Sequence, residues 1–359
     1  MTADFLIIGG GIAGVSAAAR LSHLGRVVLL EAEAQLAHHA SGRSAALFEP
    51  RYGPAPVVEL SLISDSHLRH AQGGVLSPRG LMVLAGPGQR AAFEADRDGM
   101  DLAGITVAEA CAAVPILNPA AIAHAARAEH GWDVDTDLLI GNFARKARAN
   151  GGKIVTGAPV RALRRDGALW RAETPAGAFA AGHVVNAAGA WADRVAAMAG
   201  VRPLGLVPYR RSVARIAAPG GHDVTHWPML FGAGESWYAK PDAGALIVSP
   251  AEEDRTEPQD AWADDMVLAE GLARYEAMVT VPVTRPIATW AGLRTFAPDR
   301  VPVIGPDPAV PGFLWLAGQG GYGFQSAPAA SQLLADLAAG RDPVLAADIV
   351  AALSPARLS

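Results

Sequence analysis

The chain has 359 residues and 51% of them are hydrophobic, so it is long enough for two domains with sizeable cores. Its formal net charge of −5 leaves no general basic surface, which argues against nucleic acid as a partner. Asp4 stands where a signal peptide has basic residues, and no stretch reads as a transmembrane segment. We therefore expect a cytoplasmic protein, with a peripheral contact to the inner membrane left open. The single cysteine, Cys111, excludes an internal disulfide and is expected to pack in the core.

The chain begins with the pattern of a strand followed by a glycine turn. Phe5–Ile8 is a short apolar run typical of a parallel strand that is buried on both faces. Gly9, Gly11 and Gly14 follow with the G-x-G-x-x-G spacing. In this spacing the glycines allow a tight turn, a close approach of the backbone to a pyrophosphate, and close packing of helix on strand.

A helix and a second strand complete this unit. The backbone amides of Ile12 and Ala13 are expected to open the helix and point at phosphates, and Gly25 is expected to end it. Val27–Leu30 is the second strand, and Glu31 follows it directly. A carboxylate there can accept both hydroxyl protons of an adenosine ribose and would repel a 2′-phosphate. The unit therefore predicts a site for FAD or NAD, and argues against NADP.

The next segment is rich in small and hydroxyl-bearing residues that suit a loop against phosphate, ribityl chain and ring. These residues are Ser41, Gly42, Ser44, Ala45 and Ala46. Arg43 could add a positive charge to the same site, although such a run is equally typical of a simple turn before a helix. The pair His38 and His39 could bind a metal or carry a covalent flavin. No third ligand stands at a recognisable spacing, so no metal site is expected.

Further elements are expected from hydrophobic periodicity and turn residues. Those before residue 200 are a strand in 76–84, helices near 87–101 and 107–114, a helix from 133 to 149, a strand at 153–156, an antiparallel ribbon of 160–163 with 170–174, a buried strand at 183–186 and a helix at 192–199. From Val201 to Thr284 alternating segments predict an antiparallel sheet. A strand at 313–317 leads to a glycine-rich string, Gly318–Ser326, which opens a helix over 327–337 that ends near Gly340.

The glycine-rich string places a second helix N-terminus where an anion would be stabilised. NAD dehydrogenases seldom need this second turn. The N1–C2=O region of a reduced flavin gains negative charge, which a helix start near Gly320–Phe324 would stabilise. We therefore expect FAD as the cofactor. The expected fold class is α/β (α+β overall), with a Rossmann-like FAD-binding domain and a substrate domain built on a mixed or antiparallel sheet. The expected boundaries are 1–80, 135–205 and 290–359 for the first and 81–134 and 206–289 for the second.

Longer strings give a resemblance to a known family. Gly9 to Glu31, Asn186-Ala-Ala-Gly-Ala-Trp, and Arg294 with the segment up to Gly305 resemble the D-amino acid oxidase superfamily of flavoproteins. Within it, strings such as Ser41-Gly-Arg-Ser-Ala-Ala and Gln319-Gly-Gly-Tyr-Gly-Phe-Gln are similar to the bacterial D-arginine dehydrogenases. The likeness runs over nearly the whole chain. It implies hydride transfer from the Cα of a D-amino acid to flavin N5, and hydrolysis of the imine to a 2-oxo acid and ammonia.

The resemblance also implies roles for individual residues. Arg294 would hold the substrate carboxylate in a bidentate pair, helped by the hydroxyls of Tyr52 and Tyr238, with Arg211 nearby. Gln325 and the carbonyl of Gly321 would receive the substrate amine. The residues expected to bind FAD are Gly9, Gly11, Ile12, Ala13, Gly14, Glu31, Ala32, Ser41, Gly42, Arg43, Ser44, Ala45, Ala46, Val160, Ala188, Gly189, Trp191, Gly320, Tyr322, Gly323, Phe324 and Gln325.

Two departures from the family pattern concern the substrate pocket. Leu81 stands where the arginine-specific enzymes have a glutamate that pairs the guanidinium, and Leu47 stands where relatives have a histidine. We therefore expect apolar D-amino acids to be preferred over basic ones, because an unpaired buried charge costs several kcal/mol. Glu49 and Arg51 are new charges that could instead create a polar specificity pocket.

Alternatives remain open at this point. The same hydride chemistry would oxidise a secondary amine, such as an N-methylated or cyclic amino acid. A flavin-bearing subunit that only relays electrons is a second alternative, against which the retention of Arg294, Tyr52 and Tyr238 argues. The flavin is expected to be non-covalent, because Ser44 stands where some relatives carry a linking histidine and Cys111 lies outside the flavin motifs. The electron acceptor, whether oxygen, a quinone or a protein, stays unknown.

Overall fold

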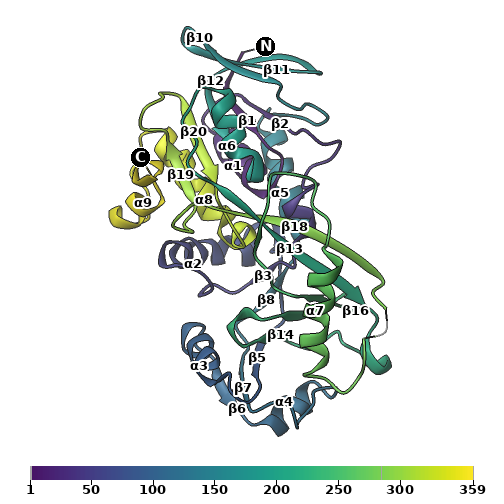
Figure 1. Ribbon diagram of the computed structural model, residues 1–359. Helices are drawn as coiled ribbons and strands as arrows, with labels where there is room; N and C mark the ends of the chain where they lie inside the picture. The colour runs from purple at the N-terminus through teal and green to yellow at the C-terminus, as the bar shows by residue number, and fades with distance from the viewer. Residues whose placement is uncertain (1, 284, 359) are drawn as a thin grey trace.

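The computed structural model describes residues 2–283 and 285–358 (Figure 1). Met1, Thr284 and Ser359, which stand at limits of the expected domains and of the expected sheet region, lie outside the described residues. The two main sheets occupy opposite ends of the molecule, and the long strands β13 and β18 of the second sheet reach toward the first (Figure 1). The chain is a mixed α/β fold, as expected.

The first sheet has eight strands and is centred on β1. Its members are β1 (Thr2–Ile8), β2 (Val27–Leu30), β9 (Lys153–Val155), β10 (Ala162–Asp166), β11 (Leu169–Thr174), β12 (Gly177–Asn186), β19 (Val303–Pro306) and β20 (Phe313–Ala317). β1 pairs in parallel with β2 and β12, whereas β10 and β11 form the expected antiparallel ribbon. Phe5 and Ile7 enter the core on one face of β1, and Leu6 and Ile8 enter the core on the other. This alternation is that of a strand buried on both faces, as its apolar run predicted.

Helices cover this sheet and carry the glycine turns. They are α1 (Ile12–Leu21), α2 (Ala55–His70), α5 (Thr136–Ala149), α6 (Ala192–Met198), α8 (Gly323–Ala338) and α9 (Ala347–Leu353). α1 packs against α5 and α8, and α2 packs against α8. The expected end of α1 at Gly25 is wrong. The helix ends at Leu21, because the chain leaves it at Ser22, whose backbone amide still donates to Ala18, and then turns toward β2.

The second sheet has nine strands and is largely antiparallel. Its members are β5 (Leu81–Ala85), β6 (Ala103–Ile105), β7 (His124–Ala128), β13 (Val207–Ile216), β14 (Met229–Gly232), β15 (Tyr238–Asp242), β16 (Ala245–Ser249), β17 (Asp254–Arg255) and β18 (Ala288–Phe296). β5 and β14 are a parallel pair, so the sheet is mixed. β18 pairs with β13 along nine residue positions, and the sheet therefore crosses the domain boundary expected at residue 290. A smaller sheet of β3 (Leu47–Phe48), β4 (Leu76–Pro78) and β8 (Trp132–Val134) lies between the two (Figure 1).

Three helices accompany the second sheet: α3 (Arg90–Gly99), α4 (Val107–Ala113) and α7 (Asp265–Glu276). α7 corrects the expectation of sheet alone between 201 and 284. Its N-cap, Asp264, accepts hydrogen bonds from the backbone amides of Met266 and Val267, which is the ordinary way in which a helix start is satisfied. Cys111 is partly buried in α4 and packs beside the core of this sheet. None of the described helices is long and apolar enough to cross a membrane.

Candidate active site

The first glycine turn has the close packing that its spacing predicted. Gly9 has φ +109°, and a Cβ on Gly14 would overlap the carbonyl oxygen of Gly9, so helix α1 can approach β1 only through glycine. The amide of Ile12 donates to the hydroxyl of Ser41 at 3.0 Å. The helix start and the loop that begins at residue 40 therefore meet at the place where a phosphate was expected.

Glu31 is fixed against this turn. Its carboxylate is buried and accepts from the amide of Gly10 at 2.5 Å and from the amide of Glu33 at 2.8 Å. Each carboxylate oxygen can accept more than one hydrogen bond, so capacity remains for a ribose hydroxyl. The acid is thus held in position by the backbone before any cofactor binds.

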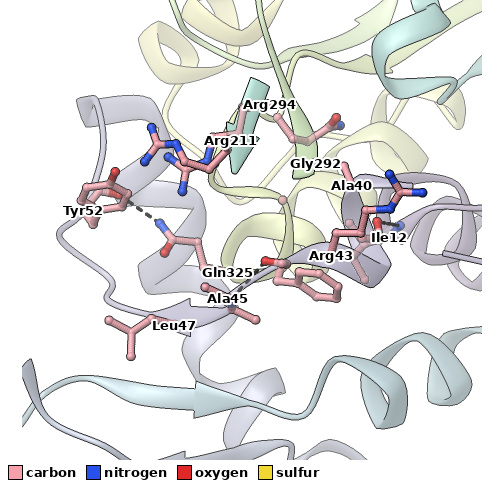
Figure 2. Close-up of a pocket in the computed structure, with 18 of the residues that line it drawn as sticks. Ile12, Ala40, Arg43, Ala45, Leu47, Tyr52, Arg211, Gly292, Arg294 and Gln325 are labelled. Carbon is pink, nitrogen blue, oxygen red and sulfur yellow. Dashed lines mark hydrogen bonds between the residues drawn. The ribbon is translucent and has the colours of Figure 1, made fainter. Parts of the chain in front are cut away.

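One cavity joins the two glycine turns to the expected substrate site (Figure 2). Of the residues expected to bind FAD, it is lined by Gly11, Ile12, Ala13, Ser41, Arg43, Ser44, Ala45, Ala46, Gly189, Gly320, Gly323, Phe324 and Gln325. Outside its lining are Gly9, Gly14, Glu31, Ala32, Gly42, Val160, Ala188, Trp191 and Tyr322. Two of these residues make close contacts elsewhere: the backbone of Gly42 lies against the carbonyl of Ala37, and the ring of Trp191 packs on His39 with centroids 4.7 Å apart. The loop itself is a short 3₁₀ helix, Ala40–Arg43, and no α-helix starts there.

The positive charge of Arg43, which was expected to contribute to the cofactor site, is paired with the carboxylate of Asp260. Its guanidinium bonds to the carboxylate of Asp260 and to the carbonyls of Ala261 and Ala291. Asp260 comes from the distant segment before α7, so no local pattern could have shown this partner. Arg43 therefore lines the cavity but ties the loop to the second sheet.

His38 and His39 gain an acidic neighbour that the sequence spacing did not suggest. Glu33 Oε1 accepts a hydrogen bond from His39 Nε2 at 3.0 Å, and the possible ligand atoms of Glu33, His38 and His39 all lie within 4.8 Å of one another. Asp260 lies 3.8 Å from His38 and 3.7 Å from His39. The cluster is part of the ion-pair network that includes Arg43.

Two arginines lie side by side on one face of the second sheet. Arg211 on β13 is opposite Gly292 on β18, and Arg294 is opposite Tyr209, so the arginines are diagonal neighbours. Arg211 is only 5% exposed, and among the residues that the structure describes it forms an ion pair with Glu253, at 3.3 Å. Burial and then the charge of Arg294 lower the pKa of Arg211. Both arginines line the cavity, and two positive charges side by side suit a carboxylate ligand (Figure 2).

Two tyrosines surround Arg294. Tyr52 and the buried Tyr238 both line the cavity, and burial raises the pKa of Tyr52 above its ordinary value although Arg294 opposes this. Burial alone would lower the pKa of Arg294, but the two phenols and Glu235 outweigh it, so the guanidinium stays charged. The structure thus brings together the arginines and tyrosines that the resemblance named.

Glu235 is a cavity residue that the sequence analysis missed. Its Oε1 accepts a hydrogen bond from the hydroxyl of Tyr52 at 2.7 Å, and its backbone has φ +52°, in the left-handed region. The preceding amide of Gly234 donates to Asp96 at 2.7 Å and fixes the turn to α3. A lone glutamate in a glycine turn has the pattern of any solvent-exposed residue, so no signal in the sequence could have identified it.

Gln325 and Gly321, the two residues expected to receive the substrate amine, both line the cavity. Gln325 is buried in the first turn of α8, and its Nε2 donates to the carbonyl of Tyr52 at 3.0 Å, which leaves its Oε1 as an acceptor (Figure 2). A Cβ on Gly321 would lie 3.1 Å from Arg294 Cζ. The glycine backbone therefore lies directly on the guanidinium, and a side chain there would displace it.

The wall away from the arginines is formed by residues of β3, β5 and their neighbours. Leu47, Glu49, Leu81 and Met100 all line the cavity, and Leu81 is fully buried. All three residues that were expected in the substrate pocket are thus brought together. Met100, from the end of α3, was not expected.

These features define a class of protein: a dinucleotide-binding oxidoreductase whose cofactor cavity continues into a cationic substrate pocket. The family model for FAD dependent oxidoreductases (DAO) matches residues 4–337. The chain therefore belongs to this family, and its cofactor is FAD. The glycine cradle, the buried Glu31 and the second helix start fit this cofactor.

Curated relatives match over most of the chain. Human mitochondrial dimethylglycine dehydrogenase is 28% identical over 366 residues, which cover 93% of this chain and 42% of that protein. Glycine oxidase of Pseudomonas putida is 26% identical over 373 residues, which cover 96% and 97%. This chain thus spans less than half the length of the human relative.

Solved structures show the same fold. Glycine oxidase from Geobacillus kaustophilus superposes with a TM-score of 0.83 at 24% identity and covers 98% of both chains. L-proline dehydrogenase from P. horikoshii has a TM-score of 0.83 at 23% identity and covers 99% of this chain and 97% of that one.

Proposed function

We propose that this protein is an FAD-dependent D-amino acid dehydrogenase or oxidase that produces a 2-oxo acid and ammonia. The observation that carries the proposal is the pair Arg211 and Arg294 on one sheet face, bordering the cavity that both glycine turns line. The D configuration is taken from the resemblance to the D-arginine dehydrogenases. We also propose the domain division 1–80, 135–205 and 290–359 for FAD binding and 81–134 and 206–289 for substrate binding, with strand β18 crossing the boundary at 290.

In this proposal the chain's own residues bind and orient the substrate. Arg294 clamps the carboxylate in a bidentate pair, with Arg211, Tyr52 and Tyr238 around it. Gln325 Oε1 and the Gly321 carbonyl accept from the amine. Two fixed groups on one carbon orient its C–H bond, and such positioning supplies a large part of the rate enhancement. FAD, when bound, supplies the acceptor for the hydride that leaves this carbon.

A second candidate function is the oxidation of a secondary amine. Relatives named dimethylglycine dehydrogenase, L-proline dehydrogenase and iminodiacetate oxidase favour it. An electron-relay subunit without its own substrate is a third, weaker alternative. All three share the flavin site and differ in what the arginine pocket receives.

The test is an anaerobic screen of flavin bleaching with both enantiomers of the common amino acids, glycine, sarcosine and dimethylglycine, followed by air exposure. The proposed function predicts bleaching by D-amino acids with release of ammonia. Bleaching only by N-methylated or cyclic substrates, with formaldehyde or a cyclic imine as product, would establish the second candidate. If no amino acid bleaches the flavin, the third candidate, a subunit that only relays electrons, would be supported.

We further propose that the enzyme prefers apolar to basic side chains. Leu81 is fully buried in the pocket wall, and an unpaired guanidinium against it would lose several kcal/mol of solvation. We expect kcat/KM for D-leucine or D-methionine to exceed that for D-arginine, and Leu81→Glu to shift the ratio toward D-arginine. A wild-type enzyme that is more efficient on D-arginine would overturn this prediction.

We expect the flavin to be released intact by acid. Ser44 lines the cavity where some relatives carry a linking histidine, and Cys111 lies in α4 beside the core of the second sheet. Acid precipitation should therefore leave the yellow colour in the supernatant. Colour retained in the protein pellet after washing would show a covalent bond and would direct attention to His38 and His39.

A further inference from the structure

Glu49 provides a buried carboxylate in the cavity wall opposite the two arginines. Glu49 is only 2% exposed and lines the cavity together with Leu47 and Leu81. Because side chains alternate along an extended chain, Glu49 points to the same side as Leu47, while Phe48 between them enters the core. Figure 2 shows Leu47 and the two arginines on opposite sides of Gln325. A substrate side chain that extends away from the arginines therefore meets this wall.

Glu49 is held in place by His130. Its Oε2 lies 2.7 Å from His130 Nδ1, and its Oε1 accepts from the amide of Arg51 at 3.0 Å. The other ring nitrogen of His130 lies 3.3 Å from the carbonyl oxygen of Asp101. A carboxylate and a carbonyl are both acceptors, so the doubly protonated imidazolium satisfies both contacts, whereas a neutral ring can donate to only one.

The electrostatics agree with this arrangement. Burial alone would lower the pKa of His130, but the hydrogen bond and the charge of Glu49 outweigh it and raise the pKa above its ordinary value of 6.5. Burial raises the pKa of Glu49, and the bonds from Arg51 and His130 oppose this. The neighbouring charges form their own ion pairs, Arg51 with Asp101 and Arg127 with Glu129. The wall therefore carries a neutral ion pair while His130 is protonated and a net negative charge once it is not.

We propose that Glu49, positioned by His130, is the specificity-determining residue for the substrate side chain and accepts a hydrogen bond from a donor at its end. This inference rests on the proposed function and deepens it. Leu47, Leu81 and Met100 contact an apolar stem, and Glu49 receives a terminal amide or hydroxyl group. While His130 is protonated, a neutral donor is preferred over a cation. Loss of that proton admits cationic side chains.

The first experiment compares kcat/KM for D-glutamine and D-methionine, which have similar length and differ in the terminal donor. We expect the ratio of D-glutamine to D-methionine to fall about tenfold or more in Glu49→Leu, as for loss of a hydrogen bond to a charged group. Glu129→Gln is the matched control, because it removes a neighbouring carboxylate that does not line the cavity, and its ratio should equal that of the wild type. Flavin content and Tm of each variant report folding.

The second experiment is made first on the wild-type enzyme, with Glu49→Leu as its control. In the wild type the ratio of kcat/KM for D-lysine to that for D-methionine should rise with pH above the ordinary histidine pKa, as His130 loses its proton. Both substrates share the titration of the α-amine, so the ratio isolates the side-chain end. Glu49→Leu should make this ratio independent of pH.

The two experiments distinguish a failure of the proposed role of Glu49 from a failure of the proposed D-amino acid oxidation. If D-amino acids do not reduce the flavin, the proposed function fails. If they do, and the D-glutamine ratio is unchanged in a folded Glu49→Leu variant, only the role of Glu49 is overturned. A D-lysine ratio that is constant between about pH 6 and 9 in the wild type would equally overturn it.

Discussion

Replacement of Arg294 by alanine is expected to lower kcat/KM for the best D-amino acid substrate by about 10²- to 10³-fold. Removing one partner of a buried, hydrogen-bonded charge pair costs about 2–5 kcal/mol, and each 1.36 kcal/mol is a factor of ten. KM should rise most, because the carboxylate is held in the ground state as well as in the transition state. Arg294→Lys should recover only part of the loss, since lysine keeps the charge but lacks the planar fork.

Steady-state kinetics with anaerobic flavin reduction measure this effect. Arg210→Ala is the matched control: it removes the neighbouring arginine of β13, which is paired with Asp254 and Asp264 and does not line the cavity. It should change kcat/KM by less than about threefold, as expected for a partly exposed ion pair. An Arg294→Ala variant that binds flavin and also loses less than threefold would show that the carboxylate is held elsewhere.

Gly14→Ala is expected to abolish FAD binding. The added Cβ would overlap the carbonyl oxygen of Gly9, which is backbone at the centre of the turn and cannot move aside without separating α1 from β1. The protein should purify without the visible absorbance of bound flavin. Its Tm should fall because a bound cofactor stabilises the folded state by mass action.

Gly104→Ala supplies the control for this substitution. Gly104 lies in β6, and a Cβ there would meet no atom within 4 Å among the described residues. This variant should keep the flavin-to-protein ratio and the Tm of the wild type. Full flavin content in Gly14→Ala would contradict the close helix–strand approach on which the dinucleotide site depends.

The elements that the sequence predicted well are those whose signals are local. The strand, glycine turn, helix and strand of residues 5–31 and the helix after Gly323 were recognised because strand and helix periodicities and turn residues repeat within a few positions. The end of α1 was placed four residues too late, at Gly25, since a glycine after a helix was taken as its cap. α7 was missed because alternating strands dominate its surroundings.

The sequence by itself determined a dinucleotide site, because the glycines, the helix start and Glu31 lie within one short βαβ unit whose geometry each residue enforces locally. The second glycine-rich helix start, at Gly318–Ser326, then favoured FAD over NAD. The family resemblance named most residues of the substrate pocket, but only the tertiary structure decided how they lie relative to one another. Arg211 and Arg294 become neighbours through the register of β13 with β18, and Tyr52 meets Glu235 across the cavity. Glu49 meets His130 in the same way, between segments far apart in the chain. Such pairs depend on how whole sheets pack against one another. The sequence around one partner therefore gives no signal that identifies the other.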